Sequence, residues 1–179
     1  MNNGYLHITW IAEGHDKDGN TTYYCEKPNL VVNTGKEEVL KFVGGITTAS
    51  ASGFIFLGYG ASAITPDVTH SKLGGTSGHE YIGATIRQTI TDFAVSDETY
   101  VYSGLTFTEK LTGSTTIGPS NPNGTVSGVP INMAGLFNTY TLPATVGGSS
   151  GIMLNEVELS NTYTLFDDNS LTLTVVVRQ

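Results

Sequence analysis

Charge and cysteine are the two things that this sequence has least of. Charged residues make up 13% of the chain, about half the usual share. Acidic residues outnumber basic ones by 16 to 8, which gives a formal net charge of −8. Because there is no basic run, we expect no surface for nucleic acid or for an anionic membrane. The one cysteine, Cys25, cannot form an intramolecular disulfide, so we expect a fold that does not depend on oxidation.

Long apolar runs are missing as well. No window approaches the roughly 18 to 20 apolar residues that a membrane-spanning helix requires. The opening residues Met-Asn-Asn-Gly lack the basic start and apolar block of a signal peptide. We therefore expect a soluble protein that is made and folded in the cytoplasm of a cell.

Glycine, serine and threonine are abundant instead. The chain contains 22 Gly, 26 Thr and 14 Ser among its 179 residues. Threonine favours strands, whereas Gly and Ser favour turns and disfavour helix interiors. This composition argues against a helical bundle or a doubly wound α/β domain, and the hydrophobic share of 39% argues against disorder. A chain of this length forms one ordinary domain, so we predict a single β domain over residues 1–179.

The N-terminal segment predicts a first pair of strands. Residues 5–12 and 21–26 are rich in strand-forming residues, and Asp16-Lys17-Asp18-Gly19-Asn20 between them has turn chemistry. We therefore predict that residues 1–26 form an N-terminal hairpin or arm.

The rest of the chain predicts more strands and long loops. Residues 54–57 are a continuous apolar run, which is typical of a strand buried on both faces. In residues 162–178 a turn sequence precedes a strictly alternating strand, which predicts a hairpin with Leu171, Leu173, Val175 and Val177 on one face. The Gly- and Ser-rich segments 60–78, 112–128 and 143–151 predict long loops. Together these features predict an all-β fold, an antiparallel β-sandwich or jelly-roll-like domain.

One helix is predicted, over residues 34–45. Thr34 and Glu37 have the spacing of a capping box, in which a hydroxyl and a carboxylate satisfy the first free N–H groups. The apolar residues Val39, Leu40, Phe42 and Val43 follow, and Gly44-Gly45 supplies a stop. We expect this to be the only substantial helix and to cover one end of a sheet.

Two motifs resemble ligand-binding loops but lack residues that such loops require. Asp16-x-Asp18-x-Asn20 begins like a calcium loop, but Thr21 replaces the required Gly and Lys27 replaces the bidentate Glu. Gly58-Tyr59-Gly60 resembles a dinucleotide loop without its third Gly or its helix. We interpret the first as a hairpin turn and the second as a turn after a buried strand.

No catalytic constellation emerges from the remaining candidates. Cys25 has no activating neighbours and is expected to pack as a small apolar group, and no Gly-x-Ser-x-Gly elbow selects a serine nucleophile. Glu156 and Glu158 share one face of a strand and could mimic a glycosidase pair, but such pairs border a cleft, so we favour a solvated face. We therefore predict a protein that is not an enzyme and needs no metal or cofactor. Its histidines are scattered without metal-ligand spacing, at His7, His15, His70 and His79.

The predicted N-terminal hairpin is rich in aromatic residues. Tyr5, Trp10, Tyr23 and Tyr24 are candidate partner-binding residues, because large rigid rings anchor protein interfaces. The alternative is that the same rings belong to the core on one sheet face.

Three stretches resemble structural proteins of tailed bacteriophage virions. The first is residues 28–35, Pro-Asn-Leu-Val-Val-Asn-Thr-Gly, which leads into the predicted helix. The second is residues 54–61, Phe-Ile-Phe-Leu-Gly-Tyr-Gly-Ala, with Pro66-Asp67, Leu73 and Arg87 further on. The third is residues 131–137, Ile-Asn-Met-Ala-Gly-Leu-Phe, then Gly151-Ile152-Met153-Leu154 and the closing strand. In that group the third stretch often contains Glu-x-Gly-Leu-Phe, and here Met133 takes the place of the Glu.

This resemblance implies a β-rich building block present in many copies in a virion. A capsid decoration or cement protein is favoured, with the major capsid protein or other virion proteins as partners and a homo-oligomer as the expected assembly. A tail, collar or fibre-attachment component is the alternative. A different class of function, a carbohydrate-binding β-sandwich module, would require exposed aromatic rings on a concave sheet face.

Overall fold

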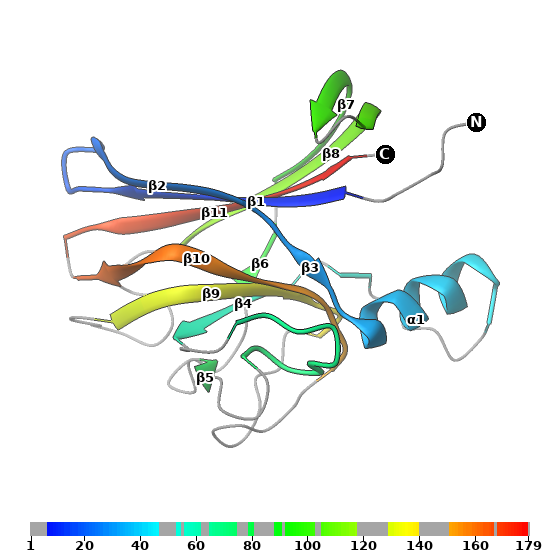
Figure 1. Cartoon of the computed structure of the whole chain (residues 1–179). Helices are drawn as coiled ribbons and strands as arrows, with labels where there is room; N and C mark the ends of the chain where they lie inside the picture. The colour runs from blue at the N-terminus through cyan, green and yellow to red at the C-terminus, as the bar shows by residue number, and fades with distance from the viewer. Residues whose placement is uncertain are drawn as a thin grey trace.

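The computed structural model describes the chain in segments that cover most of its strands. These segments contain eleven strands and one helix (Figure 1). The described residues are 7–46, 53–54, 56–61, 65–74, 79–80, 88–90, 92–102, 105–117, 129–139, 151–166 and 168–178.

The first sheet joins the two ends of the described chain. Its strand order is β2-β1-β11-β8-β7. Strand β1 pairs with β11 over its whole length, from His7 opposite Arg178 to His15 opposite Ser170. The strands are β1 (His7–His15), β2 (Thr21–Pro28), β7 (Asp92–Tyr102), β8 (Leu105–Ile117) and β11 (Ser170–Arg178).

The second sheet has the order β3-β10-β9-β4-β5, and β6 pairs with the other end of β4. All the strand pairs described in both sheets are antiparallel. The sheets lie one above the other in Figure 1, so the predicted all-β antiparallel sandwich with one short helix is confirmed. The strands are β3 (Leu30–Val31), β4 (Phe56–Ala61), β5 (His79–Glu80), β6 (Gln88–Thr89), β9 (Val129–Phe137) and β10 (Met153–Leu165).

The predicted N-terminal hairpin is confirmed where the chain is described. Strands β1 and β2 pair from Thr9 opposite Pro28 to His15 opposite Thr21. Gly19 occupies the turn with a φ of 83°, a conformation that glycine adopts without steric cost.

The predicted C-terminal hairpin is wrong. Strand β10 pairs with β9 and β3, whereas β11 pairs with β1 and β8, so the chain crosses between sheets after Leu165. The predicted turn is confirmed, because the Asn169 side chain accepts the Phe166 N–H at 2.7 Å and donates to the Thr164 carbonyl at 3.0 Å. Turn residues determine that the chain reverses, but not which strand the returning segment will pair with.

Two predicted irregular segments are strands. Gly58-Tyr59-Gly60 lies inside β4, where Gly58 stands opposite Gly135 of β9, because cross-strand pairing overrides the turn preference of glycine. Strand β8 continues to Ile117 into the predicted loop 112–128, of which residues 118–128 lie outside the described residues.

The central core fills the space between the two sheets. Both sheets contribute to it, with Trp10 on β1 fully buried. On β11 the predicted alternation is confirmed, since Leu171, Leu173 and Val175 are buried in this core and Val177 packs against it. Further buried residues of the central core include Ile8, Ala12, Cys25, Leu57, Tyr59, Ile131, Ala134, Leu136, Leu154, Val157, Leu159, Tyr163 and Leu165.

A second, smaller group of apolar side chains, here called the outer cluster, involves the second sheet. On β9 the residues Ala134 and Leu136 belong to the central core, while Met133 and Phe137, which flank them, belong to this other group. Because successive side chains of a strand point to opposite faces, the outer cluster lies on the sheet face turned away from the central core. It consists of Val32, Leu73, Met133, Phe137 and Met153, with Phe56 packed against them.

The helix α1 (Asn33–Val43) lies close to its predicted position, but its predicted cap is wrong. The N-cap residue is Val32, which makes no side-chain capping bond, and the Thr34 hydroxyl donates instead to the Met153 carbonyl at 3.4 Å. The helix begins at Asn33 because the preceding backbone is bonded to other segments. The Val32 N–H donates to the Leu154 carbonyl, and the Asn33 N–H donates to the Val68 carbonyl. The predicted stop is confirmed by the Gly44 N–H, which donates to the Leu40 carbonyl at 2.9 Å.

Candidate functional site

The four predicted partner-binding aromatics have different environments. Tyr5 lies outside the described residues. Trp10 is fully buried in the central core, so the core alternative holds for it, and the prediction that it anchors a partner is corrected. Tyr23 is half-buried, its ring 5.4 Å from that of Tyr163, and its hydroxyl donates to the Asn161 carbonyl at 2.9 Å.

Tyr24 is the member of the three described that faces solvent. Its side chain is 58% exposed, and its hydroxyl donates to a Glu26 carboxylate oxygen at 2.9 Å. That bond raises the pKa of Tyr24, because it stabilises the protonated phenol beside a negative charge. The structure therefore leaves one ring of the described three available to a partner.

The C-terminal half of α1 and the residues just after it expose a group of large apolar side chains, here called the α1 patch. Leu40 is 71% exposed, Phe42 69%, Val43 77% and Ile46 51%. The sequence predicted that this apolar stripe would cover a sheet. Figure 1 shows that α1 extends away from the sandwich, with no labelled strand beside its far half.

The buried side of α1 is formed by its first turns. Gly35 and Glu38 are the buried residues of the helix, and Val39 is partly buried against the central core. A Cβ at Gly35 would lie 2.4 Å from the Leu154 carbonyl oxygen. Glycine therefore allows the helix to approach the β10 backbone directly, which orients the apolar residues of the later turns toward solvent.

A buried carboxylate holds the segment 65–74 against the second sheet. Glu156 of β10 is fully buried, and it accepts hydrogen bonds from the Asp67 N–H at 3.1 Å and the Gly74 N–H at 3.0 Å. His70 Nδ1 contacts the same carboxylate. The prediction that Glu156 lies on a solvated strand face is wrong, because a distant segment of the chain covers it.

Glu156 and its partners form a structural anchor. A general acid or base must reach the proton that it moves, whereas both oxygens of Glu156 are engaged by groups of the 65–74 segment. Asp67 is also committed, since it accepts from the Thr69 N–H at 2.8 Å and the Thr69 hydroxyl at 2.6 Å. These bonds lower the pKa of Asp67. The arrangement positions Leu73 over the outer cluster.

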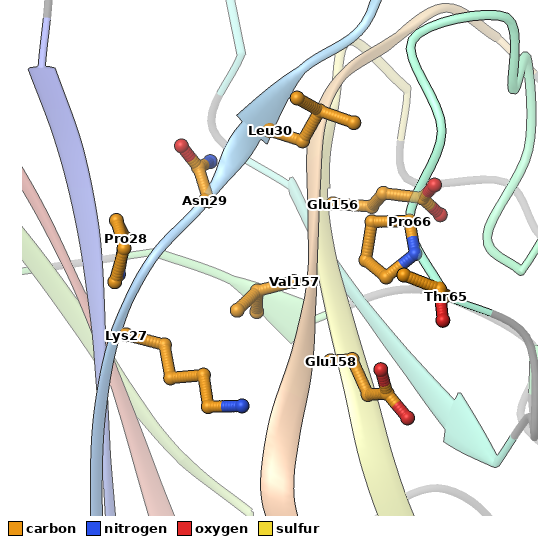
Figure 2. A pocket seen from close by; sticks show the side chains of 9 residues that line it. All are labelled: Lys27, Pro28, Asn29, Leu30, Thr65, Pro66, Glu156, Val157 and Glu158. Atoms are coloured by element: carbon orange, nitrogen blue, oxygen red, sulfur yellow. The ribbon is translucent and has the colours of Figure 1, made fainter.

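A groove of about 330 Å³ lies where β2, β3 and β10 meet (Figure 2). Val157 and Leu30 are apolar residues of its lining. Figure 2 shows the Lys27 side chain extending toward β10 from one side, while the Glu158 carboxylate lies on the other side, near Pro66. The described lining residues are Lys27, Pro28, Asn29, Leu30, Thr65, Pro66, Glu156, Val157 and Glu158.

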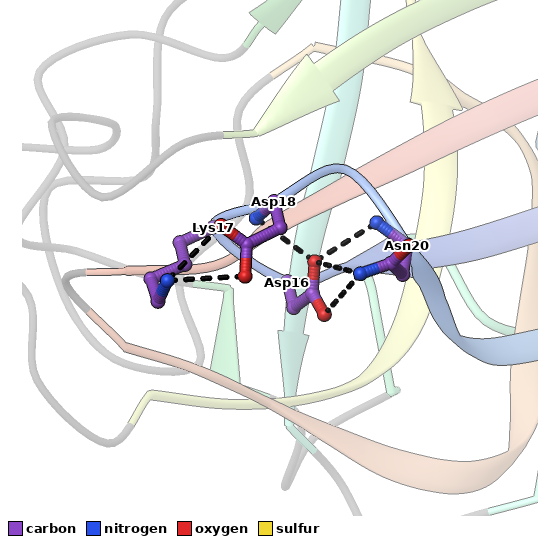
Figure 3. Close-up of polar contacts among 4 residues, drawn as sticks. All are labelled: Asp16, Lys17, Asp18 and Asn20. Atoms are coloured by element: carbon purple, nitrogen blue, oxygen red, sulfur yellow. Dashed lines mark hydrogen bonds and ion pairs between the residues drawn. The ribbon is translucent and has the colours of Figure 1, made fainter.

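The calcium-like sequence forms a hairpin turn, as predicted (Figure 3). One Asp16 oxygen accepts from the N–H groups of Asp18 at 2.9 Å and Asn20 at 2.8 Å, and the Asn20 side-chain amide bonds both oxygens. These bonds lower the pKa of Asp16. Within the segments given above, no group of three or more His, Cys, Asp or Glu residues is arranged to hold a metal ion.

Cys25 packs in the central core, as predicted. Its sulfur accepts from the Ser160 N–H at 3.3 Å and contacts the Ser160 hydroxyl at 3.5 Å. The thiol therefore links β2 to β10.

Two features of functional interest were missed by the sequence analysis. The sequence did contain one indication of the α1 patch. A glycine inside a helix often marks close packing, so Gly35 could have identified the face that packs on the sheet and left the apolar stripe for solvent. For Glu156 there was no local signal, because its partners Asp67, His70 and Gly74 are 82 to 89 positions away.

No protein-family model, curated protein or solved structure matches the chain. Among the described residues, no helix is long and apolar enough to cross a bilayer.

Proposed function

We propose that the chain is a non-enzymatic structural protein of a tailed-phage virion, and specifically a capsid decoration or cement protein. Its partner would be the major capsid protein, together with other copies of itself. The observation that carries the proposal is the α1 patch. Three large apolar side chains at the end of α1, with Ile46 just beyond it, are exposed to water, and exposed apolar surface of this kind marks interaction sites.

The arrangement of the three stretches that resemble phage virion proteins supports this proposal. Val32 belongs to the first stretch, Phe56 and Leu73 to the second, and Met133 to the third. All four belong to or pack against the outer cluster. Short motifs that meet in one packed unit are a stronger basis for a resemblance than the same motifs scattered over the molecule.

The physical demands of a cement protein match the surfaces described. Such a protein needs apolar contact area at defined points and no catalytic chemistry. Repetition over a lattice multiplies weak individual contacts, because each copy that is bound raises the effective concentration of the next contact. The α1 patch with Tyr24 on β2 supplies two such points, on different elements of the sandwich.

The α1 patch can be tested by substitution. Leu40→Ser and Phe42→Ser together should leave the melting temperature nearly unchanged, because both side chains are already exposed. The same variant should lose co-sedimentation with purified particles. Phe166→Ser is a matched control, since Phe166 is also an exposed large apolar residue, 45% exposed, but follows β10. Full co-sedimentation of the double variant would contradict the proposed docking role.

Copy number separates the capsid from the tail. A decoration protein should occur in hundreds of copies per particle, whereas a tail, collar or fibre-attachment component should occur in a few to a few dozen. Quantitative mass spectrometry of purified particles measures this number directly. Absence of the chain from particles would contradict the virion assignment altogether.

The described residues offer no observation that favours the carbohydrate-binding alternative. Among the residues whose side chains the structure describes, which do not include those of β7 and β8, the exposed aromatic rings are Tyr24 on β2, Phe42 on α1 and Phe166 after β10. A sugar-binding face would gather such rings on one sheet.

A further inference from the structure

The edge of strand β10 is open to a ligand at one residue, Glu158. On one side of it Leu30 of β3 stands opposite Glu156, and on the other side the Ser160 N–H donates to the Cys25 sulfur at 3.3 Å. Backbone groups face the same edge of a strand at every second residue, so the N–H and C=O of Glu158 face this edge, as the Ser160 N–H does. Among the described residues no strand pairs with them there. The opening therefore accommodates a single peptide group.

The groove described above lies over this opening and carries one free charge of each sign. Lys27 and Glu158 are both partly exposed. Neither side chain takes part in a hydrogen bond or ion pair of the described residues. Figure 2 shows Lys27 reaching toward β10 on the side of Val157, while the Glu158 carboxylate lies on the opposite side, near Pro66. Each charge is therefore available to a ligand group of the opposite sign.

The rest of the lining restricts what the groove can hold. Glu156 is already committed, since both of its oxygens are bonded within the protein. Pro28, Leu30 and Val157 add apolar surface. The volume of about 330 Å³ lies at the lower end of the range for small-molecule sites. The lining therefore suits a small ligand that carries one charge of each sign and an apolar part.

We propose that this groove binds a zwitterionic dipeptide. Its ammonium group would lie at Glu158 and its carboxylate at Lys27, because charge-assisted hydrogen bonds are the strongest that these side chains can make. Its one peptide N–H would donate to the open Glu158 carbonyl, and an apolar side chain would contact Val157 and Leu30. A longer extended peptide does not fit, because the next positions along the β10 edge are occupied by Leu30 and Cys25. This inference does not rest on the virion assignment.

Three ligands test the two charges on the full-length protein. Glycyl-leucine should give saturable NMR shifts centred on the Glu158 amide. N-acetylglycyl-leucine lacks the ammonium group, and glycyl-leucinamide lacks the carboxylate. Each of these two should bind about tenfold more weakly, which corresponds to the loss of one charge-assisted hydrogen bond. No saturable binding of glycyl-leucine, or equal binding of all three ligands, would overturn the proposal.

Two variants of similar side-chain size assign each charge to its end of the ligand. Glu158→Gln should weaken the binding of glycyl-leucine by about tenfold and leave that of N-acetylglycyl-leucine unchanged, because the acetylated ligand has no ammonium group. Lys27→Met should likewise weaken the binding of glycyl-leucine and not that of glycyl-leucinamide. Glu26→Gln is the matched control, since Glu26 is an exposed carboxylate of β2 outside the groove, and it should leave all three affinities unchanged.

A charge variant that weakened the binding of all three ligands equally would contradict the proposed ion pairs. If a variant does not fold, the comparison of the three ligands on the unaltered protein still decides the proposal.

Discussion

The central core and the outer cluster are two solutions to the same problem, burying apolar side chains against the second sheet. The central core joins many large side chains from both sheets, with Trp10 fully enclosed. The outer cluster has five buried members and is covered by Leu73 from an irregular segment. That segment is held in place by the buried Glu156, which bonds the Asp67 and Gly74 N–H groups.

The difference shows what is needed when apolar area is scarce. In the central core, burial contributes a free energy of about 25 cal/mol per Å² of apolar surface. This contribution adds up over many residues, so that no single polar contact is decisive. Over the outer cluster the covering segment has no regular hydrogen-bond ladder, and its N–H groups must find other acceptors. The Glu156 carboxylate meets that need, because it bonds two of these N–H groups and also contacts His70. The two regions should therefore respond differently to substitution.

The largest effect is expected in the central core. Trp10→Ala should lower the free energy of unfolding by about 3 to 5 kcal/mol, because it creates a large cavity. Trp10→Phe should cost less, since the indole N–H makes no hydrogen bond in the described structure. Urea denaturation followed by circular dichroism measures both. A loss below about 1 kcal/mol for Trp10→Ala would restore the idea that this ring serves a partner rather than the core.

A comparable but more local effect is expected from the anchor of the outer cluster. Glu156→Ala removes the acceptor of two backbone N–H groups and should cost about 3 kcal/mol, because each orphaned buried donor costs about 1 to 3. Hydrogen exchange should accelerate at Asp67 and Gly74 more than at β1. Glu158→Ala, two residues away on the same face, is the control and should change stability little. Uniform acceleration across both sheets would erase the distinction between the two regions.

Gly35→Ala tests the contact that joins the helix to the second sheet. The new methyl group would meet the Leu154 carbonyl oxygen at 2.4 Å, and overpacking of this kind costs about 1 to 3 kcal/mol. The backbone can relieve the clash only by moving α1 away from β10. Lys36→Ala, at the next and exposed position, is the matched control. Thermal denaturation of the two variants should differ clearly, and equal melting temperatures would contradict the close approach.

Thr34→Ala should have a small effect. The capping box would predict a larger loss, but the hydroxyl makes one bond, to the Met153 carbonyl at 3.4 Å. Losing a single hydrogen bond of this kind costs about 0.5 to 1.5 kcal/mol. Adding Glu37→Ala should then be additive, because Glu37 pairs with Lys41 at 2.7 Å and not with the helix start. A strong coupling between the two substitutions in denaturant unfolding would reinstate the capping box.

The smallest effect concerns pH and the segment 65–74. Hydrogen bonds from Thr69 lower the pKa of Asp67 below its ordinary value of 3.8. A carboxyl with a lowered pKa in the folded state contributes stability above its unfolded pKa and loses it as pH falls through the folded value. Hydrogen exchange at Thr69 should therefore rise below pH 3.8, before exchange in the central core does. Asp67→Asn should remove this pH dependence, and an unchanged profile would show that another group is responsible.

Local patterns in the sequence were sufficient for the fold class and for several elements. The alternation of Leu171, Leu173 and Val175 identified a core-facing strand, and the Asp16–Asn20 turn identified the first hairpin. The Gly44-Gly45 stop marked the end of the helix. In each case the determining interactions lie within a few residues of one another, so the pattern is visible in the sequence.

The tertiary structure alone decided which strands pair and which surfaces are covered. The turn before Ser170 reverses the chain in either arrangement, but β11 pairs with β1 because their registers and apolar faces match along nine residue pairs. The apolar stripe of α1 is exposed because the helix extends past the sandwich, and Glu156 is buried because residues 67, 70 and 74 fold over it. These outcomes depend on contacts between residues far apart in the chain, and a local pattern carries no information about which distant segment will arrive.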